Sequence, residues 1–177
     1  MYKHIKLIGV KAQKAAENKI NLKKKNLVLN DYVNLLEKEK KFIIKKNIKD
    51  IKFAKKIKLK ENLINRLQLN QEKLNNIKKS VIKIAKLKDP VGNTLDKWNR
   101  PNGLTISRVS IPIGVIGVIY ESRPNVTSDV ASLCFKSGNA VILKGGSEAI
   151  NTNRALAKLF RKALKKNKVN ENFIQFI

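Results

Sequence analysis

The alternation of short apolar strands with amphipathic helices in residues 113–177 restricts the fold of this chain more than any other feature of its sequence. Residues 115–120 are rich in β-branched side chains and apolar on both faces, which is typical of a buried parallel strand. Shorter apolar strands are expected at 140–143 and 173–177. Two helices are expected between them, with apolar faces formed by Val126, Val130, Leu133 and Cys134 in the first and by Leu156, Leu159, Phe160 and Ala163 in the second. Strands that helices join in this way lie parallel, so the pattern predicts an α/β fold with a Rossmann-like sheet.

The first 89 residues differ in character, because they contain one glycine and no proline and are expected to form polar helices. In the clearest of these helices Asn70 is placed to cap the N-terminus, and Pro90 follows its end. Its apolar face consists of Leu74, Ile77, Val81 and Ile84. Apolar residues mark two further helices, at Val28, Tyr32, Leu35 and Leu36 and at Leu63, Ile64 and Leu67.

Turn-forming residues cluster between residues 90 and 103, where the helical pattern ends. The apolar residues that follow indicate an extended hairpin or arm; they are Leu104, Ile106 and Val109. We therefore divide the chain into a helical segment (1–89), an arm (90–112) and a partial nucleotide-binding domain (113–177).

The formal net charge of +26 first suggests a nucleic acid or an anionic membrane as the partner. However, 33 of the 39 basic residues are lysine and only six are arginine, whereas base and phosphate recognition relies on arginine forks. Aromatic residues make up 6% of the chain and are not interleaved with the basic ones, as a stacking platform would require. The abundance of lysine, isoleucine and asparagine indicates an AT-biased genome, so nucleic acid is not the partner we expect.

A membrane is not expected as a partner either, because the longest apolar run, residues 111–120, is interrupted by proline and glycine. It is also well short of the roughly 20 apolar residues of a membrane span. The single cysteine, Cys134, cannot form an internal disulfide, so we expect a reducing, cytoplasmic setting. No metal site is expected.

The candidate binding residues follow two of the predicted strands, where parallel sheets bind their ligands. In the segment 121–125, Arg123 lies beside a helix N-terminus and makes a local anion site, unless it pairs with Glu121 or a neighbouring acid. In the segment 144–148, two glycines allow close approach of a ligand, Lys144 supplies a positive charge, and Ser147 is placed to cap the next helix. Without other information, an ordinary strand-to-helix turn with a glycine hinge is the slightly better explanation of this second segment.

Two residues with reactive side chains, Cys134 and His4, receive no role. Cys134 lies on the apolar face of a predicted helix with no histidine near it in sequence, and buried structural cysteines are usually inert. His4, the only histidine, is close to the N-terminus.

Residues 109–148 resemble a known enzyme family, the gamma-glutamyl phosphate reductases (glutamate-5-semialdehyde dehydrogenases) of the aldehyde dehydrogenase superfamily. The two most characteristic segments are GVIGVIYESRPNVT at 114–127 and SGNAVILKGGSEA at 137–149. Further matches are DPVG at 89–92, RPNGL at 100–104 and LINRL at 63–67. The resemblance covers nearly the whole chain, and it is weaker before residue 60.

The resemblance implies the aldehyde dehydrogenase fold, in which residues 90–112 correspond to an arm that joins subunits. It also implies NADPH-dependent reduction of L-glutamyl 5-phosphate to glutamate 5-semialdehyde in proline biosynthesis, through a catalytic cysteine that forms a thioester. A homo-oligomer and a complex with glutamate 5-kinase are the partners that such an enzyme would have.

The resemblance implies roles for the residues of this chain that stand at matching positions of the family's motifs. The cofactor segment comprises Lys144, Gly145, Gly146, Ser147 and Glu148. Lys144 matches a cofactor-ribose lysine and Glu148 approximates a ribose-contacting acid; alternatively, Lys144 and Ser147 hold the 2′-phosphate of NADPH. The substrate and oxyanion region comprises Ser122, Arg123 and Asn125.

The chain departs from the family in length, because it ends at Ile177, before the position of the family's catalytic cysteine. We therefore expect a truncated form of the fold that is inactive and poorly stable alone. A broken gene, an incomplete sequence and one half of a split enzyme remain equivalent explanations. The competing hypothesis, from another class, is a non-catalytic basic scaffold that binds nucleic acid.

Overall fold

The three strands predicted near the C-terminus form one parallel sheet in the computed structural model, which describes residues 2–177. The sheet order is β3-β4-β5, with β3 at Val115–Ile119, β4 at Ala140–Lys144 and β5 at Ile174–Phe176. Helix α6 (Pro124–Lys136) connects β3 to β4, and α7 (Ile150–Lys166) connects β4 to β5. Short 3₁₀ turns, η1 (Ser147–Ala149) and η2 (Glu171–Phe173), flank α7. The predicted α/β class is therefore confirmed.

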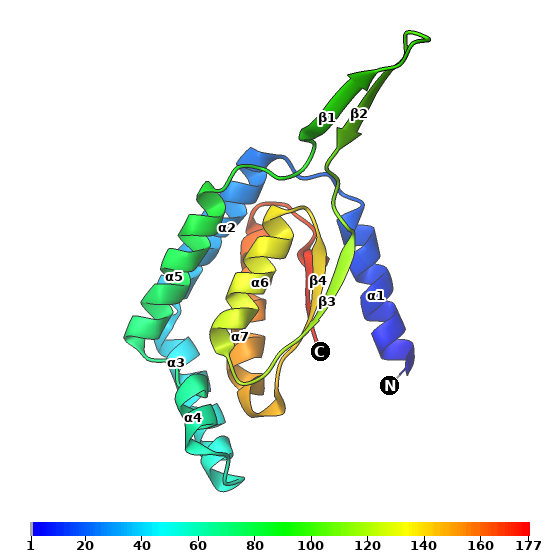
Figure 1. Ribbon diagram of the computed structural model, residues 1–177. Helices are drawn as coiled ribbons and strands as arrows, with labels where there is room; N and C mark the ends of the chain where they lie inside the picture. Colours follow the sequence, from blue (N-terminus) through cyan, green and yellow to red (C-terminus); the bar gives the residue numbers. More distant parts are fainter. Residues whose placement is uncertain (1) are drawn as a thin grey trace.

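Helices form layers on both sides of this sheet (Figure 1). Helix α1 covers one face, whereas α6 and α7 cover the other and are covered in turn by α2 and α5. The five helices before the sheet are α1 (Tyr2–Ala16), α2 (Leu22–Lys38), α3 (Lys40–Lys56), α4 (Glu61–Leu67) and α5 (Gln71–Lys86). None of the helices in residues 2–177 is long and apolar enough to cross a membrane.

Aromatic rings join the outer layer to the sheet layer. The rings of Tyr32 in α2 and Phe160 in α7 have centroids 4.5 Å apart. Phe135 of α6 meets Phe160 edge-on at 5.9 Å and Phe173 at 5.5 Å. All four rings are fully buried, so they form a continuous core across three helices.

Helix α5 follows the sequence prediction closely. Its buried residues include all four that the spacing selects: Leu74, Ile77, Val81 and Ile84. The side chain of Asn70 accepts a hydrogen bond of 2.8 Å from the Lys73 amide, as expected of an N-cap.

The predicted hairpin is also present, as two antiparallel strands that extend away from the layers (Figure 1). They are β1 (Thr94–Asn99) and β2 (Thr105–Val109), and every residue in them is exposed. Gly103 has a φ of 82°, which suits the left-handed conformation of the turn between them.

Two expectations about burial were wrong. Strand β3 is parallel, but it lies at the edge of the sheet, and Ile119 is 86% exposed. On α6 the expected face is buried only in part: Cys134 is buried, but Leu133 is 48% exposed, and small polar residues also point inward. Those inward-facing polar residues are Thr127, Ser128 and Ser132.

Candidate functional site

The two segments predicted to bind ligands meet at one edge of the sheet. The register pairs Ile119 with Lys144, so β3 and β4 end side by side. The hydroxyl of Ser122, after β3, donates a short hydrogen bond to a carboxylate oxygen of Glu148, after β4. Ser122 is only 3% exposed, so this contact is buried on one side and links the two strand-end loops.

Gly145 is required by the packing of this chain itself. A Cβ atom there would lie 2.2 Å from the amide nitrogen of Asn153 and 3.2 Å from the Tyr120 ring. A Cβ at Gly146 would lie 2.0 Å from a carboxylate oxygen of Glu148. Within the protein, these glycines allow side chains to approach the backbone closely.

A chain of buried hydroxyls supports the loop after β4. Thr127 donates to the side-chain oxygen of Asn153 at 3.0 Å, so the Tyr120 hydroxyl donates to Thr127 at 2.6 Å. Burial raises the pKa of Tyr120, which keeps the phenol neutral as a donor.

The N-terminus of α7 is closed by a carboxylate from α3. Asp50 accepts hydrogen bonds from the amides of Asn151 (3.1 Å) and Thr152 (2.7 Å) and from both of their side chains. Asp50 is 1% exposed. The expectation that Ser147 caps this helix was therefore wrong, and this helix end is not free to bind a phosphate.

Lys144 and Ser147 remain exposed at the carboxyl edge of the sheet. The Lys144 ammonium makes only a long contact of 3.4 Å to the Gly145 carbonyl, and no acid pairs with it within residues 2–177. A cation and a hydroxyl are thus presented together to an incoming ligand.

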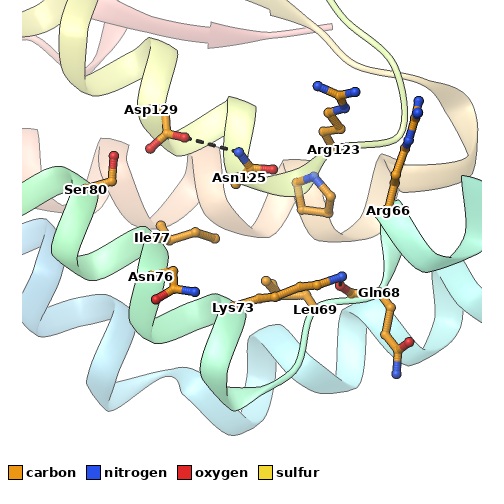
Figure 2. A pocket seen from close by; sticks show the side chains of 11 residues that line it. Arg66, Gln68, Leu69, Lys73, Asn76, Ile77, Ser80, Arg123, Asn125 and Asp129 are labelled. Atoms are coloured by element: carbon orange, nitrogen blue, oxygen red, sulfur yellow. Dashed lines mark hydrogen bonds between the residues drawn. The ribbon is translucent and has the colours of Figure 1, made fainter.

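A cavity of about 410 Å³ adjoins the first strand-end loop, between α4 and α5 on one side and the start of α6 on the other (Figure 2). Its charged lining residues are Arg66, Lys73, Arg123 and Asp129. Arg123 forms no ion pair with Glu121 or any other acid in the described chain, which removes the alternative left open for it. Asn125 also lines the cavity, so two of the three predicted substrate-region residues face it.

Sequence reasoning missed most of this cavity, because its other wall comes from residues about fifty positions earlier. The missed polar residues are Arg66, Gln68, Lys73, Asn76, Ser80 and Asp129. The spacing of Lys73, Asn76 and Ser80 contained a signal, since it repeats every three or four residues beside the apolar face of α5.

Cys134 has no activating environment. It is 8% exposed, and burial raises the pKa of its thiol to about 11, so the thiol is almost entirely protonated at neutral pH.

Comparison with known proteins places this arrangement in a family. The chain is 43% identical over 170 residues to the gamma-glutamyl phosphate reductase of Desulfatibacillum aliphaticivorans, which covers 94% of this chain and 41% of that protein. The crystal structure of gamma-glutamyl phosphate reductase from Thermotoga maritima matches with a TM-score of 0.92 at 38% identity, over 96% of this chain and 42% of that one. No family model matches the chain.

A more distant structure extends the fold assignment. An acetylating aldehyde dehydrogenase from Geobacillus thermoglucosidasius matches with a TM-score of 0.66 at 12% identity, over 99% of this chain and 36% of that one. The fold is thus part of the aldehyde dehydrogenase fold, and the chain spans about two fifths of the length of the first relative. Because sequence and fold agree over nearly its whole length, the chain belongs to the gamma-glutamyl phosphate reductase family, and it corresponds to the N-terminal part of those proteins.

Proposed function

We propose that the chain supplies the cofactor edge and part of the substrate pocket of a cytoplasmic reductase that converts L-glutamyl 5-phosphate to glutamate 5-semialdehyde and phosphate, in proline biosynthesis. The observation that carries this proposal is the 43% identity to a gamma-glutamyl phosphate reductase across 94% of the chain. Two predicted ligand segments that meet at one sheet edge, beside a cationic cavity, support it further.

The residues at this edge fit a nicotinamide cofactor that carries a 2′-phosphate. Lys144 and Ser147 are exposed and lack an acidic partner in the described chain, so they suit a phosphate. One carboxylate oxygen of Glu148 already accepts a hydrogen bond from the Ser122 hydroxyl, and this contact disfavours Glu148 as the acid that contacts the ribose. We therefore prefer the 2′-phosphate role for Lys144 and Ser147. When bound, the cofactor supplies the hydride for the reduction.

On the substrate side, we assign Arg123 and Asn125 to the acyl phosphate end. Both line the cavity and are exposed. Ser122 has already donated its hydroxyl to Glu148, so we assign it to positioning that loop and not to an oxyanion site. Cys134 is not the nucleophile, and the family's catalytic cysteine has to come from sequence outside these residues.

The exposed hairpin fits the subunit-joining arm that the family implies. Its large apolar residues Leu95, Trp98 and Leu104 are 60%, 40% and 61% exposed. We propose that residues 90–112 pair with another subunit in a homo-oligomer, between a helical segment (1–89) and a partial cofactor domain (113–177). A complex with glutamate 5-kinase is compatible with this function.

A chimera tests the proposed reaction. The chain would replace the matching N-terminal part of the Thermotoga maritima reductase, and NADPH oxidation would be followed with L-glutamyl 5-phosphate. We expect turnover by the chimera and none by the 177-residue chain alone. A folded, oligomeric chimera without turnover would contradict the proposal.

The cofactor assignment has its own test. We expect Lys144→Ala to weaken NADPH binding much more than NADH binding, because only NADPH carries the 2′-phosphate. Titrations of both cofactors into the wild type and the variant would show this, and Lys168→Ala is a matched control distant in sequence from the loop. Equal weakening of the two cofactors would count against the assignment.

A further inference from the structure

The cavity beside α6 separates opposite charges along its length. Figure 2 shows the side chains of Arg66 and Arg123 toward one end and the carboxylate of Asp129 toward the other. The Lys73 ammonium lies along the floor, where it donates to the carbonyls of Asn65 (2.7 Å) and Gln68 (2.8 Å) at the end of α4. Two arginines without acidic partners in the described chain therefore face one end of the cavity, and a carboxylate faces the other.

Asp129 is only half satisfied. One carboxylate oxygen accepts a hydrogen bond of 3.2 Å from the Asn125 side chain, one turn earlier in α6. The other oxygen is buried and has no hydrogen-bond partner, and no cation pairs with Asp129 within residues 2–177. The oxygen that faces the cavity is therefore the one in the exposed hydrogen bond with Asn125, and an N–H donor of a cationic ligand group would bind the carboxylate there.

Ser80 and Asn76 of α5 line the cavity at the Asp129 end (Figure 2). They add uncharged hydrogen-bonding groups that suit an ammonium or the carboxylate next to it. The volume of about 410 Å³ is within the range of small-molecule sites, roughly 300–1,000 Å³.

We propose that Asp129 binds the α-ammonium group of an acidic amino-acid substrate whose side-chain acyl end lies toward Arg66 and Arg123. This inference rests on the proposed function and adds the group that distinguishes a glutamyl compound from a simple dicarboxylate. Asp129 is thus a specificity-determining residue. It contacts the substrate at the end opposite to the reacting carbon.

Calorimetric titration of the cofactor-free chimera with L-glutamate and with glutarate tests this inference, because glutarate lacks only the ammonium group. We expect the wild type to prefer L-glutamate by about tenfold or more, as charged hydrogen bonds of 1.5–3 kcal/mol imply. We expect Asp129→Asn to weaken L-glutamate by a similar factor while glutarate binds no more weakly than before. Asp96→Asn, on the exposed hairpin, makes the same change in net charge and should leave both affinities unaltered.

Several outcomes would overturn the inference. One is a wild type that binds both ligands equally or binds neither. Another is a variant that keeps the preference, or one in which both affinities fall together. The wild-type comparison needs no variant, so it decides the matter even if Asp129→Asn fails to fold.

These titrations need neither cofactor nor catalytic cysteine, so they separate this inference from the proposed reaction. A preference for L-glutamate together with an inactive chimera would leave an amino-acid site without the reductase. An active chimera without the preference would remove only the role of Asp129.

Discussion

The two helices that follow β3 and β4 begin at the same edge of the sheet, but their N-termini are treated differently. At α7, the buried carboxylate of Asp50 accepts four hydrogen bonds and closes the helix end. At α6, no side chain caps the helix, Pro124 opens it, and the adjoining residues line a cavity. One helix end is part of the core of the protein, whereas the other lines the cavity that we propose as a substrate site.

This difference shows why position in a Rossmann-like sheet does not by itself identify a phosphate site. Any helix N-terminus has a dipole and first-turn amides that favour an anion, and position in the sheet alone would select both of these ends. At α7 the carboxylate of Asp50 already occupies the helix end, so our proposal assigns a cofactor phosphate to the exposed side chains of Lys144 and Ser147. At α6 the charge comes from Arg123, which has no acidic partner in the described residues.

Removing Asp50 should have the largest effect on this comparison. We expect Asp50→Ala to lower the free energy of unfolding by about 3 kcal/mol, since it leaves buried donors of Asn151 and Thr152 without a partner. Urea unfolding, with exposed Asp96→Ala as the control, measures this. A loss below about 1 kcal/mol would show that the cap is not structural.

A methyl group at Gly145 should have a smaller but clear effect. We expect Gly145→Ala to cost about 1–3 kcal/mol, because the new Cβ would overlap Asn153 and crowd the Tyr120 ring. Gly117→Ala in β3 is the matched control, since nothing lies within 4 Å of a Cβ there. Equal unfolding free energies for the two variants would mean that the loop after β4 is not fixed by this contact.

Acid should loosen the opposite end of α6, where Asp89 receives hydrogen bonds from buried Lys25 at 2.8 and 2.9 Å. Partial burial opposes ionisation, but hydrogen bonds from Lys25 and the Val91 amide outweigh it and hold the pKa of Asp89 below its usual range. Ionised Asp89 therefore contributes its full stabilisation of the folded state above the unfolded-state pKa of about 3.9. That stabilisation is lost as the pH falls through the lower pKa of the folded state.

The melting temperature of the wild type and of Asp89→Asn between pH 7 and pH 3 tests this. The variant should be less stable at neutral pH and should lose less stability on acidification. Asp31, whose pKa is also lowered, contributes equally to both proteins. Parallel curves for the two proteins would contradict the role of Asp89.

Arg123→Gln should have the smallest effect on stability, within about 0.5 kcal/mol, because the side chain is exposed and unpaired in the described chain. It should nevertheless weaken both L-glutamate and glutarate, since it removes a cation from the cavity. A stability loss above about 1 kcal/mol would show that this end of α6 is also structural.

Local signals predicted α5 well, because its N-cap and its apolar spacing both lie within one helix. The buried face of α6 was missed for the opposite reason. Its inward side includes small polar residues, and two of them have distant partners: Ser128 bonds to the Tyr32 hydroxyl at 2.6 Å and Thr127 to Asn153 at 3.0 Å. Hydrophobic spacing cannot identify a face of that kind.

The residues of the candidate site also fall into two groups, those that local sequence signals predict and those that only the tertiary fold brings together. The residues after β3 and β4 were predictable, because strand ends in a parallel sheet share an edge. Asp50 was not, since it is 101 residues from Asn151 in sequence and only the tertiary fold brings them together. The cavity wall from α5 was missed for the same reason, although its polar spacing was visible.

Backbone amide shifts of the isotope-labelled chain during titration with NADPH test the central claim most directly. We predict that shifts will concentrate in residues 121–125 and 144–148 and that lysine-rich α1, α2 and α3 will remain unchanged. Shifts that spread over those helices, and that triphosphate reproduces, would contradict a cofactor site and would favour a basic scaffold that binds anions without selectivity.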